Sequence, residues 1–150
     1  MAKYNNKRAI TLKQTTISSG QILEGMVISF RYKGGFDTDP LVLVLYNNRK
    51  TKAFEGVNLN YITPRRIEKL FESIEAEGIL LDMDEEIKGT SRDTTRIQLS
   101  SQRRLDQTTP KRFYTNVIKA DREVRKAYRT YKLEKVRSIK AIDVKRKVAS

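Results

Sequence analysis

The stretch Leu41-Val42-Leu43-Val44-Leu45-Tyr46 decides the fold, because it is a continuous apolar run in a chain that is otherwise mostly polar. Pro40 precedes the run, and Asn47-Asn48 follow it. A short apolar run between turn-forming residues is typical of a central strand that is buried on both faces, whereas a buried helix is usually longer. We therefore place a buried strand at 41–46.

Further strands are predicted on both sides of this run. Residues 22–32 are rich in β-branched and aromatic side chains, and Lys33-Gly34-Gly35 ends them with a turn signal. Asn47-Asn48-Arg49-Lys50 predicts a hairpin turn, because Asn tolerates a positive φ angle. Residues 51–57 are then the returning strand. These segments together indicate a small antiparallel sheet.

Two Thr-Pro pairs predict the starts of helices, because Thr caps a helix and Pro is favoured at its first position. Thr63-Pro64 opens a helix at 63–77, which Gly78 ends. Thr109-Pro110 opens a second helix that we extend to about Tyr128. The apolar stripe of the first helix consists of Ile67, Leu70, Phe71 and Ile74.

The remaining predictions complete an α+β protein. A short strand is expected at 94–99, and residues 131–144 are assigned to a strand, or to a strand and a bend, on their β-branched residues. The sheet is expected to be small and strongly bent, SH3-like or a partial barrel, with the first helix packed on it. The predicted segments are a flexible N-terminal arm at 1–20, an α+β body at 21–102, and a basic helix with a C-terminal extension at 103–150.

Positive charge is concentrated in the C-terminal third of the chain. Of the net charge of +13, residues 1–102 contribute +2 and residues 103–150 contribute +11. This asymmetry favours an anionic partner such as DNA or another polyanion. Docking on an acidic protein surface and simple solubilisation are the alternative interpretations.

Lys and Arg are interleaved with Tyr in this basic third. The cations can neutralise phosphates, and an exposed Tyr ring can stack on an unpaired base. The alternative is that the tyrosines pack on the body while the cations remain solvated. No base-reading motif is present, so binding is expected to be insensitive to nucleotide sequence. The candidate nucleic-acid contacts are Arg122, Arg125, Lys126, Tyr128, Arg129, Tyr131, Lys132, Lys135 and Arg137.

No enzyme site is expected. The chain has no Cys and no His, so it lacks a thiolate nucleophile, the usual general base and the commonest metal ligand. Gly34-Gly35 matches no phosphate-binding loop. The acidic run Asp82, Asp84, Glu85 and Glu86 lacks the Gly and the closing Glu of a calcium loop, so we interpret it as an exposed loop. We predict no metal, cofactor or small-molecule substrate, and keep a small carboxylate-dependent nuclease as a third functional class.

Two segments resemble known proteins. Residues 40–45, followed by Phe54-Glu55-Gly56-Val57-Asn58-Leu59-Asn60-Tyr61-Ile62, resemble a pattern in small proteins of tailed bacteriophages: a Pro-Leu strand and then Gly-apolar-Asn-Leu-x-Tyr. This resemblance implies a phage origin and a tight strand-to-helix junction shaped by Gly56, Asn58 and Tyr61. Residues 128–136 resemble the closing strand of WYL-type domains, although the Trp-Tyr-Leu motif is absent. That resemblance implies a small SH3-like barrel with a basic ligand surface.

The leading hypothesis is a phage-encoded, non-enzymatic nucleic-acid-binding protein that contacts phosphates through its basic extension. The alternative is a structural subunit of a virion tail, baseplate or neck, whose terminal arms become ordered on assembly with itself or with other subunits. No run reaches the ~20 apolar residues of a membrane span, and residues 1–6 lack the apolar core of a signal peptide. The expected location is the host cytoplasm, or the virion under the alternative.

Overall fold

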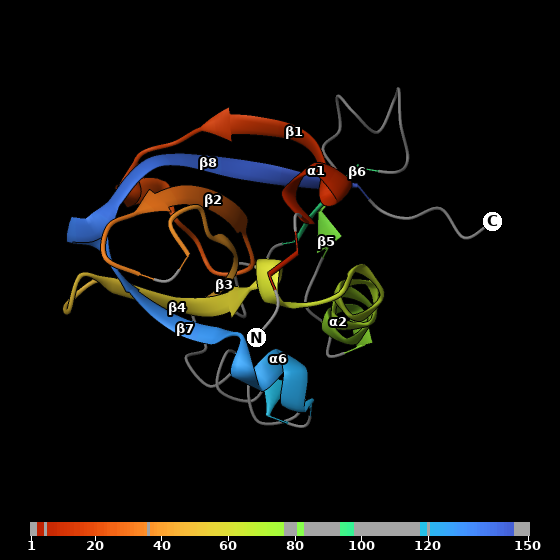
Figure 1. The fold of residues 1–150 in the computed structure, drawn as a ribbon. Helices are drawn as coiled ribbons and strands as arrows, with labels where there is room; N and C mark the ends of the chain where they lie inside the picture. Colours follow the sequence, from red (N-terminus) through yellow and green to blue (C-terminus); the bar gives the residue numbers. More distant parts are fainter. Residues whose placement is uncertain are drawn as a thin grey trace.

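The computed structural model describes residues 3–4, 6–35, 37–76, 81–82, 94–97, 118–119 and 121–145. Figure 1 shows a strongly curved sheet with α2 and α6 beside it. The described strands are β1 (Thr11–Thr16), β2 (Val27–Tyr32), β3 (Leu41–Asn48), β4 (Ala53–Asn58), β5 (Leu81–Asp82), β6 (Thr94–Ile97), β7 (Tyr128–Lys132) and β8 (Val136–Lys145). The described helices are α1 (Asn6–Ile10), α2 (Pro64–Ala76) and α6 (Arg122–Lys126), with 3-10 turns η1 (Ser19–Gln21), η2 (Leu59–Tyr61) and η4 (Leu133–Lys135). The predicted α+β class is confirmed.

The strands follow the order β5-β6-β8-β2-β3-β4-β7, and β1 also pairs with β8. Every described pairing is antiparallel. The turn η4 joins β7 to β8, so the two ends of the run β8-β2-β3-β4-β7 are consecutive in the chain. Residues 128–145 are therefore part of the sheet, whereas the sequence predicted that they belong to an extension.

The central strand β3 is buried on both faces from Leu41 to Leu45, whereas Tyr46, the last residue of the run predicted to be buried, is exposed. Leu41, Leu43 and Leu45 belong to one apolar core, and Val42 and Val44 belong to another. Successive side chains of a strand point to opposite faces, so a strand between two cores must be apolar throughout. This explains why the run is continuous rather than alternating.

The two cores differ in the elements that supply them. The first core lies between the sheet and the helices, because it includes Ile67 and Leu70 of α2 and Val124 of α6. The second core is supplied by the strands and the loops beside them, including Phe30 of β2 and Phe54 of β4. We call them the helix-side core and the sheet-side core.

The helix predicted at 63–77 is confirmed as α2. Thr63 accepts a hydrogen bond from the Arg66 backbone N–H at its Oγ1 atom (3.4 Å), as its predicted N-cap role requires. Ile67 and Leu70 are buried, so the predicted apolar stripe does face the core where it is described. Pro64 occupies the first helical position.

The N-terminal segment differs from the flexible arm predicted at 1–20. Asn6 of α1 is buried, and its Nδ2 atom donates to the backbone oxygens of Leu59 (2.7 Å) and Ile62 (2.6 Å). The strand β1 pairs with β8 from Thr11 to Thr16, with a register shift between Thr11 and Lys13. Most of β1 is exposed, so polar residues can form this strand. The alternation of apolar and polar residues that predicts a half-buried strand is therefore absent.

Boundaries of several other elements differ from the predictions. The returning strand expected at 51–57 is β4 (Ala53–Asn58), and the strand expected at 131–144 is divided between β7 and β8. The strand expected at 22–32 begins at Val27. The hairpin turn expected at 47–50 lies at 49–52, because β3 continues to Asn48, whose Oδ1 atom accepts from the Lys50 backbone N–H (3.1 Å). The helix predicted from 109 to about 128 is not continuous, because Asp121 is extended and caps a separate short helix, α6, and Tyr128 already belongs to β7. Residues 109–117 and 120 lie outside the described residues.

Asp121 connects the two helices, and replacing it with Ala is expected to cost about 1–2 kcal/mol. Its Oδ1 atom caps α6 by accepting from the Glu123 backbone N–H (3.0 Å), and both of its carboxylate oxygens accept from Arg66 Nη1 (3.0 and 2.9 Å). The ion pair is partly exposed, so we assign most of the loss to the cap. Urea unfolding measures the effect.

Arg66→Ala is the matched control, because it removes the ion pair and leaves the cap of α6 in place. It should cost less than about 1 kcal/mol. Equal losses in the two variants would contradict the capping role of Asp121.

Candidate nucleic-acid interface

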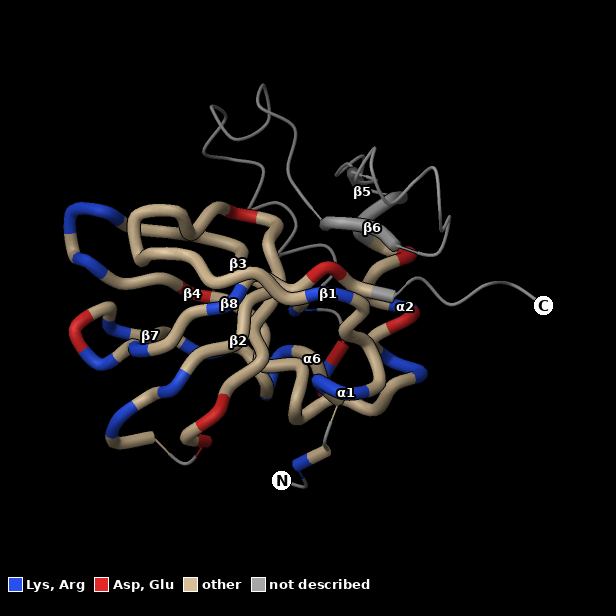
Figure 2. The backbone as a smooth tube through the Cα atoms, turned by 90° about the horizontal axis from the view of Figure 1, so that it is seen from above, with Lys and Arg blue, Asp and Glu red and all other residues tan. Residues whose placement is uncertain are grey.

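The fold divides the predicted nucleic-acid contacts into two groups. Figures 1 and 2 both place α6 away from the connection between β7 and β8, although the two are adjacent in sequence. The first group, on α6 and at the start of β7, consists of Arg122, Arg125, Lys126 and Arg129. The second group, around η4, consists of Lys132, Lys135 and Arg137.

Arginines of the first group contribute to the structure around α6. Arg129 donates from Nη1 to the backbone oxygens of Lys126 and Tyr128, the latter at 2.8 Å. Arg125 donates from Nη1 to the backbone oxygen of Lys119 at 3.2 Å. Cations near a helix C-terminus stabilise its carbonyl groups. These arginines therefore have a structural role whether or not they also contact a ligand.

The two predicted tyrosines pack on the body of the protein. Tyr131 is only 5% exposed, and its ring stacks on Phe54 with the centroids 5.4 Å apart. Its edge-to-face contacts are with Phe30 (5.2 Å) and Tyr32 (5.1 Å), and burial raises the pKa of its hydroxyl group. Tyr128, on the other face of β7, packs against the helix-side core. Tyr131 thus has too little free surface to stack on a base.

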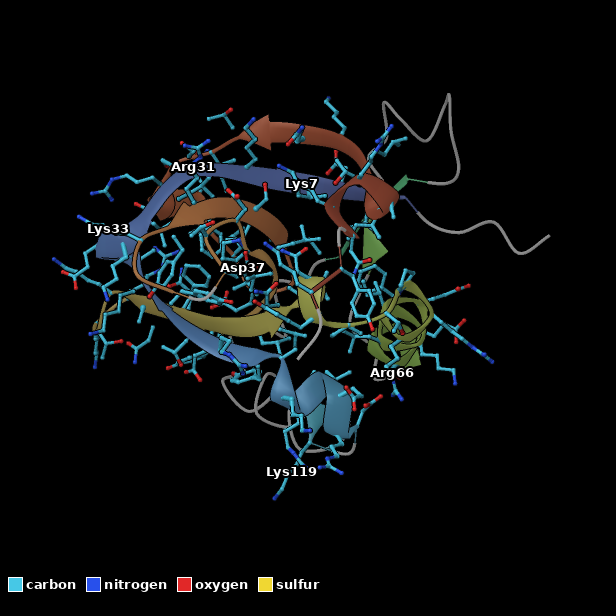
Figure 3. All side chains as sticks on the ribbon, in the orientation of Figure 1. Lys7, Arg31, Lys33, Asp37, Arg66 and Lys119 are labelled. Atoms are coloured by element: carbon cyan, nitrogen blue, oxygen red, sulfur yellow. The ribbon has the colours of Figure 1, made fainter. Side chains whose placement is uncertain are left out.

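The second group meets cations of β2 and its following loop, which the sequence did not single out. A groove of about 450 Å³ lies between β2, the loop after it, and the η4–β8 junction. Figure 3 shows Arg31 and Lys33 at this end of the molecule. We call it the basic groove, and its lining residues are Arg31, Tyr32, Lys33, Thr38, Asp39, Lys135, Arg137 and Ser138.

The strand register places two arginines side by side in this groove. Arg31 of β2 is directly opposite Arg137 of β8, and both are exposed. Like charges in directly opposite positions destabilise a strand pair. The ion pairs found among the described residues are Lys3–Asp37 and Arg66–Asp121, so neither arginine takes part in one of these. Arg137 does donate from Nη1 to the backbone oxygens of Glu134 (3.1 Å) and Val136 (2.9 Å). The groove therefore has an electrostatic cost that a bound anion would relieve.

The backbone around the groove is irregular. The β2–β8 register shifts between Ser29 and Arg31, and Ser138 on the opposite strand has a positive φ angle of 55°. Lys33 donates its backbone N–H to the Lys135 backbone oxygen at 3.1 Å, which holds the two flanking segments together. Bulges and positive φ angles outside glycine concentrate next to functional sites, where they reorient side chains.

The β3–β4 turn brings more cations to the same end. Leu133 of η4 donates its backbone N–H to the Lys52 backbone oxygen at 3.0 Å, so this turn is adjacent to η4. Figure 2 shows the Lys and Arg positions gathered on the loops at this end of the sheet. We call the whole surface the basic end; beyond the groove cations it includes Arg49, Lys50, Lys52 and Lys132, which are all exposed.

Most of these extra cations lie in a part of the chain that is nearly neutral in sum. Residues 1–102 carry a net charge of only +2, so counting charge along the sequence conceals them. One local signal was present, because Arg49-Lys50 lie in the predicted hairpin turn. Their convergence with Lys135 and Arg137 depends on strand pairing.

A second cavity of about 480 Å³ adjoins the basic groove, and Tyr32 lines both. The Tyr32 hydroxyl oxygen accepts from the Lys132 backbone N–H at 3.1 Å, which fixes the ring between β2 and β7. We call this cavity the tyrosine cleft, and its lining residues are Tyr32, Gly35, Asp37, Asn58, Tyr61, Arg129, Thr130 and Tyr131.

Asp37 is a buried carboxylate in the wall of the tyrosine cleft. Its Oδ2 atom accepts from the Nδ2 atoms of Asn58 (2.9 Å) and Asn60 (3.0 Å). Its Oδ1 atom accepts from the Asp39 backbone N–H (2.9 Å) and lies 2.9 Å from Lys3 Nζ. Burial raises the pKa of Asp37, but these hydrogen bonds outweigh burial and lower it below the ordinary value. The carboxylate is therefore charged.

The junction after β4 forms another part of this wall. Asn58 accepts from the Asn60 backbone N–H at its Oδ1 atom (3.1 Å) and so caps η2. Tyr61, the last residue of η2, is half-buried and lines the cleft. Asn58 and Tyr61 therefore both belong to the short junction between β4 and α2.

Comparison with protein-family models, curated proteins and solved structures finds no match to this chain. Within the described ranges, no group of three or more acidic side chains is placed to hold a metal ion, and Asp84, Glu85 and Glu86 lie outside those ranges. None of the described helices is long and apolar enough to cross a membrane. Function is therefore best inferred from the basic groove and the tyrosine cleft.

Proposed function

We propose that this protein is a non-enzymatic, phage-encoded nucleic-acid-binding protein that holds the phosphate backbone on its basic end. The observation that carries the proposal is the convergence of Arg31, Lys33, Lys135 and Arg137 on one groove, with Arg31 directly opposite Arg137. Asp39 supplies the carboxylate among the residues that line it.

Phosphates fit this arrangement for two physical reasons. A phosphate between two arginines offsets the repulsion that the strand register imposes on them. Each cation that neutralises a phosphate also releases a counterion, which drives binding at low salt. Backbone contacts of this kind fix position and carry no sequence information, so binding should be insensitive to nucleotide sequence.

We further propose that the curved sheet is an SH3-like barrel. The strand order β8-β2-β3-β4-β7 and the 3-10 turn η4 between β7 and β8 support this assignment. The principal contacts then lie on the loops at one end of the barrel. The first group of predicted residues, on α6, is a secondary surface under this proposal.

A structural role in the phage virion is the second candidate, and one observation favours it. Strand β1 is almost fully exposed, and Leu12 on it is 40% exposed. An exposed edge strand can pair with a strand of a neighbouring subunit. Concentration-dependent assembly in the absence of nucleic acid, abolished by Leu12→Lys, would favour this role over the first.

The test is a titration against labelled DNA at ~50 and ~200 mM salt. If the four groove cations each contact one phosphate, they contribute about −3.6 to the log–log salt slope for a duplex and about −2.8 for a single strand. Over this range of salt, that is roughly a hundredfold or roughly a fiftyfold change in affinity. A variant with Arg31, Lys33, Lys135 and Arg137 replaced by Gln should lose that part of the slope.

The matched control replaces four exposed cations that lie outside the basic end, Arg8, Lys13, Arg65 and Lys69, by Gln. It changes the net charge by the same amount and should retain most of the affinity. Equal losses in the two variants would show a general charge effect, and wild-type binding that is independent of salt would overturn the proposal.

A further inference from the structure

The tyrosine cleft differs from the basic groove in the charges that line it. One cation, Arg129, and one carboxylate, Asp37, line the cleft, and Asp37 also forms an ion pair with Lys3, whereas four cations and one carboxylate line the groove. Two half-buried rings, Tyr32 and Tyr61, line the cleft as well. An uncharged aromatic group is therefore favoured in the cleft, and an anion is favoured in the groove.

Asp37 also disfavours a phosphate in the cleft. Each carboxylate oxygen already takes two polar contacts, from Asn58 and Asn60 on one side and from Asp39 N–H and Lys3 on the other. The carboxylate only accepts hydrogen bonds, so it has no donor to offer to an incoming anion. Arg129, whose Nη1 atom is held by backbone oxygens, presents a positioned guanidinium at the same cleft.

We propose that the tyrosine cleft receives one unpaired nucleobase of a single strand whose phosphates lie in the basic groove. The inference rests on the proposed function and specifies its ligand as single-stranded nucleic acid. Tyr32 lines both cavities, so a base and its neighbouring phosphates can occupy them together. The cleft volume of about 480 Å³ lies within the usual range for small-ligand sites. A duplex keeps its bases paired and cannot fill the cleft.

Three probes of equal length, ~16 nucleotides, test this inference on the unmodified protein. They are an oligothymidine strand, the same strand with abasic residues in place of the bases, and the corresponding duplex. Stacking of one base on an aromatic ring should make the oligothymidine bind roughly five- to a hundredfold more tightly than the abasic strand. The duplex should bind less tightly than the oligothymidine strand, because it offers no unpaired base to the cleft.

The outcomes separate this inference from the proposed function. If the abasic strand binds as tightly as oligothymidine, the base-binding inference is overturned while salt-dependent phosphate binding stands. If none of the probes binds in a salt-dependent way, the proposed function itself fails.

Variants of Tyr61 test whether the base that strengthens oligothymidine binding lies in the tyrosine cleft. Tyr61→Leu should reduce oligothymidine binding to the level of the abasic strand and leave abasic binding unchanged, whereas Tyr61→Phe keeps the ring and the affinity. Tyr46→Leu is the control, because Tyr46 is 36% exposed on β3 and is not among the residues that line the cleft. Thermal unfolding establishes that each variant is folded. An equal loss in Tyr46→Leu, or a parallel loss of abasic binding in Tyr61→Leu, would overturn the assignment.

Discussion

Replacing Gly56 with Ala is expected to destabilise the protein by about 3 kcal/mol, and Gly56→Val is expected to prevent folding. Gly56 lies on β4 opposite Val44 of the central strand. A Cβ atom at this position would overlap the Leu43 backbone oxygen and would lie 2.7 Å from Val42 Cγ1. Because β3 is buried on both faces, its backbone cannot move away without disturbing both cores.

Urea unfolding of Gly56→Ala beside Gly20→Ala measures this effect. A Cβ atom at Gly20 would meet nothing within 4 Å, so Gly20→Ala should change stability by less than about 0.5 kcal/mol. If Gly56→Ala were as stable as the wild type, β3 and β4 could not be paired in the register described here.

Removing the Asp37 carboxylate is the second change with a large expected effect, about 3 kcal/mol for Asp37→Ala. The amide groups of Asn58 and Asn60 are buried and would each lose an acceptor. We discount the contribution of Lys3, because its side chain is 47% exposed and screened by water. The loss should appear in the free energy of unfolding at neutral pH.

Asp37→Asn should also be destabilising, although it keeps the shape of the side chain. The carboxylate accepts on both oxygens, so an amide NH₂ group in either orientation would face a donor. Asp39→Asn is the control, because Asp39 is exposed, and it should be nearly neutral. Wild-type stability in Asp37→Asn would mean that this carboxylate does not hold the loop after β2.

The same carboxylate makes stability depend on pH in a defined direction. The pKa of Asp37 is lower in the folded protein than the ordinary value near 3.9, so the unfolded chain binds its proton more readily. The stabilisation is fully present above about pH 4 and is lost as the pH falls through the lower folded pKa. Unfolding free energies of the wild type and Asp37→Asn, measured between about pH 7 and pH 2, should converge at the acid end. A constant difference would contradict this linkage.

Local patterns in the sequence predicted several elements well. The buried strand at 41–46, its returning partner and the helix at 63–77 were all recognisable, because apolar runs, turn residues and N-caps act over a few neighbouring residues. The strand β1 was not predicted, because it lies on the surface and its exposed polar residues do not show the alternation of apolar and polar residues that indicates a strand. A strand was predicted in the region of β8, but its pairing with β1, β2 and β6 was not.

The candidate site was predicted only in part. Lys135 and Arg137 were selected from local charge density, and both line the basic groove. Tyr131 was selected from composition, but a strand residue points inward or outward according to its register, and Tyr131 points inward. Tyr32 and Tyr61 line the tyrosine cleft, but Tyr32 has no distinguishing signal in its segment, and Tyr61 was singled out only for the strand-to-helix junction.

The sequence by itself determined which reactive and charged side chains this protein has and where its central strand lies. The absence of His and Cys, the large positive charge and the apolar run at 41–46 are properties of residue types and close neighbours. Only the tertiary structure decided where the charge gathers, because the β2–β8 register brings Arg31 opposite Arg137 from distant parts of the chain. Strand register depends on the packing of both cores at once, so no local stretch of sequence contains it.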